Sequence, residues 1–160
     1  MAKGEIFLNK YYVFWIKEEF AYHYFYKNDI LYRFLSAYQK NKDRPDLFIQ
    51  YHYITNRFPV NMLISHLHRS PHQSVQVDDH KKEIEIYNHQ HYLSLHIHEK
   101  QLVFYCESLH DAEELLFPIL RVFQPLLFVM SEINQGEYGW ISPVTKNRKN
   151  HSGQILYSYH

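Results

Sequence analysis

The sequence predicts a single α/β domain in which a mainly antiparallel sheet packs against helices. At 160 residues the chain fits one domain of ordinary size. Four stretches between residues 74 and 107 alternate apolar and polar side chains, as strands with one covered face do. The segments on both sides of them repeat apolar residues with helical spacing, which places helices next to the sheet.

The composition narrows the function classes. Lysine plus arginine number 17 and aspartate plus glutamate also number 17, so the chain has no net charge that would attract nucleic acid or an anionic membrane. We therefore expect neither nucleic acid nor a membrane as a partner. We expect no secretion signal, because the first residues include lysines and a glutamate, and no membrane-spanning helix, because no run of about 20 apolar residues occurs. Cys106 is the single cysteine, which excludes an internal disulfide and fits a reducing cytoplasm. We therefore expect a soluble cytoplasmic protein.

The first 40 residues predict a strand and two helices. Residues 10–16, KYYVFWI, are rich in aromatic and β-branched side chains, which favour strands, and residues 17–26, KEEFAYHYFY, predict a helix. Asn28 and Asp29 are residue types that begin helices, so we expect a second helix to start there. The side chains that share the inner face of this second helix are Leu31, Phe34, Leu35 and Tyr38.

The next region predicts two short helices, at 46–58 and 59–69, separated by Pro59. The side chains on one side of the later helix are Met62, Leu63, His66 and Leu67. The alternating stretches 74–79, 83–88, 92–98 and 101–107 predict an antiparallel meander, with a tight turn at 98–101.

The C-terminal part predicts a helix at 109–123, with Asp111 near its start as a cap and Pro118 as a residue that kinks the helix or limits its length. Residues 126–133 predict a further strand, and NQGEYGWISPV a turn with a closing strand or loop. In YGWISPV we expect a structural role: Gly139 allows close backbone packing, while Tyr138 and Trp140 seal one end of the core. We expect loose tails at about 1–9 and 150–160.

The helix at 17–26 carries more aromatic residues than its own domain can cover. Residues four apart lie within about 40° of each other, so three pairs point in three directions. The pairs are Phe20 with Tyr24, Ala21 with Phe25, and Tyr22 with Tyr26. Because a surface helix buries a stripe only a little over 100° wide, at least one pair should meet water or a partner. The exposed rings could be tyrosines that lie along the surface without function, or they could anchor an interface.

Several segments resemble, in the same order along the chain, the sporulation inhibitor of replication family, SirA. They are YYVFWIKEEFAYHYF, the YIT of HYITNRFP, DAEELLFPILRVFQPLLFVM and EYGWISPV. The resemblance implies a protein that binds the N-terminal domain (domain I) of the replication initiator DnaA and blocks replication during sporulation. It implies Phe20, Tyr24 and Gln50 as the partner-binding residues, with Gln50 placed by counting back from the YIT motif. Ala21 and Phe25 would then face the sheet.

Other readings of the sequence are an adaptor for a different protein and a metal-binding protein. The histidine pairs 66/68, 89/91 and 96/98 would each share a face if they lay on strands, but no HExxH or cysteine ligand set accompanies them. Cys106 could be imagined as a nucleophile, although its apolar surroundings favour packing. Exposed strand aromatics could stack on RNA bases, but the chain has no basic excess. We expect no enzymatic activity, no cofactor and no direct nucleic-acid contact.

Overall fold

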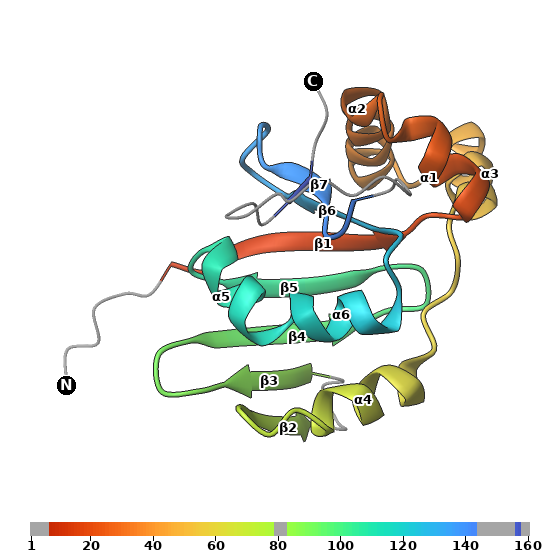
Figure 1. Ribbon diagram of the computed structural model, residues 1–160. Coiled ribbons are helices and arrows are strands. Elements are labelled where there is room, and N and C mark those ends of the chain that lie inside the picture. The colour runs from red at the N-terminus through yellow and green to blue at the C-terminus, as the bar shows by residue number, and fades with distance from the viewer. Residues whose placement is uncertain (1–6, 79–82, 144–155, 158–160) are drawn as a thin grey trace.

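A computed structural model describes residues 7–78, 83–143 and 156–157 (Figure 1). Within these residues seven strands form one antiparallel sheet in the order β2-β3-β4-β5-β1-β6-β7. Helices α1, α2 and α3 pack on one face, and α4, α5 and α6 pack on the other (Figure 1). The predicted α/β fold is confirmed.

The strands are β1 (Asn9–Trp15), β2 (Ser74–Asp78), β3 (Glu83–Tyr87), β4 (Tyr92–Ile97), β5 (Leu102–Cys106), β6 (Leu127–Ser131) and β7 (Tyr138–Trp140). The helices are α1 (Glu18–Tyr24), α2 (Asn28–Lys40), α3 (Pro45–Ile54), α4 (Val60–His68), α5 (Leu109–Leu115) and α6 (Phe117–Phe123). The predicted meander is confirmed as β2 to β5, and the turn at 98–101 closes with a hydrogen bond from the His98 amide to the Gln101 carbonyl, 2.9 Å.

Strand β1 lies between β5 and β6, where it divides the core in two. Val13 is opposite Leu102 of β5 and Val129 of β6. Successive side chains of a strand point to opposite faces, so Val13 enters the core under α4–α6 while Phe14 enters the core under α1–α3. Burial on both faces explains why β1 carries aromatic and aliphatic side chains without alternation from Tyr11 to Trp15.

Both apolar and polar contacts hold the layer of α1, α2 and α3 against the sheet. Ala21 is buried in α1, and Leu31 and Leu35 in α2, as predicted. The indole nitrogen of Trp140 donates a hydrogen bond to Oδ1 of Asn28, 2.8 Å, and both residues are buried. The second helix starts at Asn28, as predicted. Its capping position is Lys27, without a side-chain cap bond, and the Asn28 side chain is directed to the sheet.

Two single residues in the opposite layer differ from what their spacing suggested. Met62 is 54% exposed, because α4 contacts the core through Leu63 and Leu67, with Ile64 packed beside them. The N-terminal cap of α5 is Ser108, and Asp111 is the third helical residue, whose carboxylate accepts the Ser108 amide in a capping box. The helix predicted at 109–123 is broken at Leu116, and Pro118 lies in the first turn of α6.

The closing segment is structural, as predicted. Trp140 is fully buried, and a Cβ added to Gly139 would lie 2.9 Å from the Tyr157 carbonyl oxygen. Tyr157 pairs with Trp140 through two backbone hydrogen bonds. The tails predicted at about 1–9 and 150–160 lie mostly outside the described residues. None of the helices described has the length and apolarity needed to cross a membrane.

Candidate functional site

The end of β1 fixes α1 against α3. Ile16 pairs with Thr55, and the Lys17 amide donates to the Ile54 carbonyl, 2.8 Å. The Lys17 carbonyl then accepts the amide of Ala21, 2.9 Å, which closes the first turn of α1. The direction of α1 is therefore set by backbone bonds to the end of α3 rather than by a side-chain cap.

The three residue pairs of the first helix have three different environments. Ala21 and Phe25 are buried against the sheet, with exposures of 0% and 8%, as predicted. Tyr22 and Tyr26 are 45% and 60% exposed, which confirms that at least one pair meets water. The remaining pair, Phe20 and Tyr24, is half-buried at the edge of the core under α1–α3. The pair that the family resemblance implies is therefore accessible, although it is not the most exposed one.

Phe20 continues into an exposed ring on α3. Its ring centroid lies 5.3 Å from that of Tyr53, with an interplanar angle of 67°, the edge-to-face geometry that aromatic pairs prefer. Tyr53 is 62% exposed, and the Lys17 ammonium lies 5.2 Å from its ring centroid. Two rings from neighbouring helices thus form one contiguous surface.

The outer side of α3 extends this surface. Tyr51 and Ile54 of α3 are buried, which turns Ile49 and Tyr53 outward, and Ile49 is 68% exposed. Gln50 is also exposed, and it lies three residues before Tyr53, so the two side chains are neighbours on the helix.

We call this set the aromatic surface; it consists of Phe20, Tyr24, Ile49, Gln50 and Tyr53. Sequence reasoning missed Ile49 and Tyr53, although their spacing of four residues on a helix with buried Tyr51 and Ile54 was a usable signal.

The aromatic surface suits binding rather than chemistry. It presents rings, an alkyl chain and one amide, and the charged residues beside it are the exposed Glu18 and Glu19 and the half-buried Lys17. Apolar side chains at the centre with charged groups at the rim are typical of protein interfaces.

The cysteine of the sequence is placed for packing. Cys106 is fully buried, its thiol donates to the Ser108 carbonyl, 3.1 Å, and burial raises its pKa to about 12. The thiolate that a nucleophilic cysteine needs is therefore disfavoured. A histidine close to this end of α5 also has a structural role. Nδ1 of His91 lies 2.6 Å from the Asp111 carboxylate, and this contact links the β3–β4 turn to α5.

The histidine pairs do not gather into a metal site. In the part of the chain that the structure describes, no group of three His, Cys, Asp or Glu side chains could hold a metal ion. His66 and His68 lie on a helix rather than a strand, so they do not share a face. His96 and His98 do share one, and they line a groove with several lysines.

The fold and the aromatic surface define a small α/β protein with a candidate protein-binding site on its first and third helices. Comparison with known proteins identifies the family: the family described as "Sporulation inhibitor of replication protein SirA" matches residues 9–145, and the chain belongs to it. The chain is also similar to the sporulation inhibitor of replication protein SirA of Bacillus subtilis (strain 168). The two are 26% identical, over 84% of this chain and 93% of that protein.

Proposed function

We propose that this protein inhibits the initiation of DNA replication during sporulation by binding the N-terminal domain of DnaA through its aromatic surface. Family membership supports the general role. The contact between Phe20 and the exposed ring of Tyr53 is the observation that carries the choice of surface, because it joins α1 and α3 into one apolar patch.

The half-buried state of Phe20 favours tight binding. Its ring is already held by the core and by Tyr53, so little side-chain freedom is lost when a partner covers the remaining area. Gln50 would add a directed hydrogen bond at the edge of the interface. Loss of one partner in such a bond costs about 1 to 3 kcal/mol when the other partner stays buried.

Inhibition by this route requires occupancy and no catalysis. A complex that covers the surface through which DnaA assembles or recruits another protein would suffice. The proposal therefore includes no enzymatic activity and no cofactor, and it places the protein in the cytoplasm, where the initiator acts on the chromosome.

The test is calorimetric titration of the full chain with the DnaA N-terminal domain. Phe20→Ala and Tyr53→Ala should each weaken binding at least about tenfold, because central aromatic anchors contribute roughly 2 kcal/mol or more. Tyr24→Ala should also weaken binding, because Tyr24 lies beside Phe20 on the same face of α1. Gln50→Ala should weaken it less, since Gln50 lies at the edge. Tyr22→Ala is the matched control, because Tyr22 is an exposed ring of the same helix that lies on the opposite flank of α1. Its removal should leave the affinity unchanged.

Circular dichroism of each variant checks that the fold is kept. Unchanged affinity in folded Phe20→Ala and Tyr53→Ala would remove the aromatic surface as the site. If the wild-type chain does not bind the DnaA domain, the partner is a different protein, and the function proposed here is wrong.

A further inference from the structure

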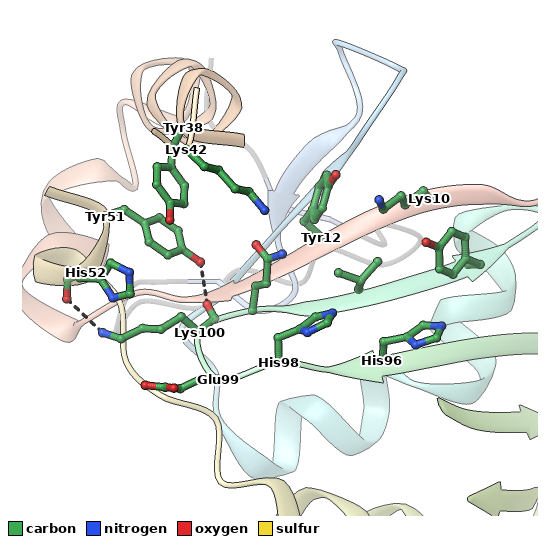
Figure 2. Close-up of a pocket in the computed structure, with 13 residues that line it drawn as sticks. Lys10, Tyr12, Tyr38, Lys42, Tyr51, His52, His96, His98, Glu99 and Lys100 are labelled. Atoms are coloured by element: carbon green, nitrogen blue, oxygen red, sulfur yellow. Dashed lines mark hydrogen bonds between the residues drawn. The ribbon is translucent and has the colours of Figure 1, made fainter. Parts of the chain in front are cut away.

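A second site lies on the other side of α3, between the helices and the uncovered part of the sheet. Helices α1–α3 cover β1, β6 and β7, and beyond them a groove of about 520 Å³ follows β5 toward β4 (Figures 1 and 2). Val103 of β5 lines it, and so do its two neighbours across the sheet, Tyr12 of β1 and His96 of β4. His52 of α3 lines the groove, whereas the next residue, Tyr53, belongs to the aromatic surface.

The groove concentrates basic side chains in a chain that has no net charge. The basic residues that line it are Lys10, Lys42, Lys100, His52, His96 and His98. Glu99 is the acidic residue of the lining, and its carboxylate is paired with Arg57, 2.9 Å.

The lysines come from three separate elements. Lys10 is on β1, Lys42 follows the end of α2, and Lys100 is in the β4–β5 turn. Figure 2 shows the Lys42 side chain extending over the groove, with Lys100 and Lys10 toward its two ends. The charge of Lys10 is partly offset by Glu132, 3.2 Å away.

Lys100 is held by neutral acceptors. Its ammonium donates to the carbonyl oxygens of His52, 3.0 Å, and Thr55, 2.8 Å (Figure 2 draws the first bond). These bonds fix the position of the charge without neutralising it. An ammonium has three donors, so one N–H remains for a ligand.

The positively charged side chains around Lys100 repel one another. Burial lowers the pKa of Lys100, and the charges of Lys17 and Arg57 lower it further, although Glu99 opposes them. Burial also lowers the pKa of His52, and the positive charge of Lys100 lowers that pKa further. An anion in the groove would remove part of this repulsion, because an opposite charge nearby favours the protonated forms.

We propose that this groove binds a small ligand that carries two or more phosphate groups. Lysines from three separate elements line a cavity within the size range of small-molecule sites, so a ligand with more than one phosphate group could contact more than one of them. Lysine ammonium groups and histidine ring nitrogens donate hydrogen bonds to phosphate oxygens. The proposal is independent of DnaA binding, since the groove and the aromatic surface share no residue.

The test is isothermal titration of the full chain with two probes, tripolyphosphate and ATP, at constant ionic strength. Both should bind, and Lys42→Glu should weaken both at least tenfold. Lys40→Glu is the matched control: an exposed lysine two residues earlier that does not line the groove. Tighter binding of ATP would assign a nucleotide, and equal binding would assign the phosphate chain alone; either result supports the site.

Histidine proton signals in NMR provide a second readout in the folded wild-type chain. His52, His96 and His98 should shift on addition of ligand, while the exposed His68 and His110, on α4 and α5, should not. Equal shifts at all five histidines, or equal affinity of Lys42→Glu and Lys40→Glu, would overturn the proposal. So would an absence of binding by both probes, or affinity for a single-stranded oligonucleotide that grows with its length and exceeds that for ATP.

Discussion

The hydrogen bond between Trp140 and Asn28 should be a main link between the helical layer that carries the aromatic surface and the sheet. The indole N–H and the amide oxygen are 2.8 Å apart, and the two residues are 0% and 1% exposed. Asn28→Ala removes the acceptor and leaves a buried donor unsatisfied. That costs about 1 to 3 kcal/mol. For a domain of this size each kcal/mol lowers the melting temperature by about 2 to 4 °C, so we expect a decrease of roughly 4 to 8 °C at the middle of the range.

A double-mutant cycle separates this bond from the other contacts of Asn28. Trp140→Phe removes the indole N–H while keeping an aromatic ring, and Asn28→Ala is then made in both backgrounds. Urea unfolding, followed by circular dichroism, gives the four free energies. Asn28→Ala should cost about 1 kcal/mol less in the Trp140→Phe background than in the wild type. Equal costs in the two backgrounds would refute the idea that this bond holds the layer in place.

Two further predictions concern the core. Gly139→Ala should destabilise the protein by about 1 to 2 kcal/mol, because the new methyl group would lie 2.9 Å from the Tyr157 carbonyl oxygen. Thermal unfolding measures this loss of stability. Gly136→Ala is the control and should change stability much less, because open space surrounds Gly136. Cys106 should react with a thiol reagent at pH 8 only after denaturation, since burial raises its pKa to about 12. Because its folded pKa lies above the unfolded value, the protonated thiol favours the folded state at pH below about 8.5, and this contribution is lost as the pH rises toward 12. Rapid labelling of the native protein at pH 8 would contradict the buried position of the thiol.

Local pattern determined the type of most elements, and it failed where a side chain had a distant partner. The alternation of EIEIY and YLSLHI was enough to predict strands, because every second side chain, Ile84 and Ile86 in one and Leu93 and Leu95 in the other, is apolar and buried. The start of α2 at Asn28 was predicted from neighbouring residue types, but the hydrogen bond that its side chain accepts from Trp140, 112 positions away, was not. Met62 was placed on the same side of its helix as Leu63 and Leu67 by spacing alone, but spacing gives the direction of a side chain without showing how far the covering layer extends, and Met62 is exposed.

The sequence by itself determined that the first helix has more apolar directions than one core can cover, because helical geometry fixes the angles between Phe20, Ala21 and Tyr22. It also determined the family, through motifs carried by the order of residues. Only the tertiary structure decided which direction is buried and that Phe20 continues into Tyr53. It alone brought Lys10, Lys42 and Lys100 to one groove. These contacts depend on the insertion of β1 between β5 and β6, and such pairing is set by packing of the whole chain rather than by local preference.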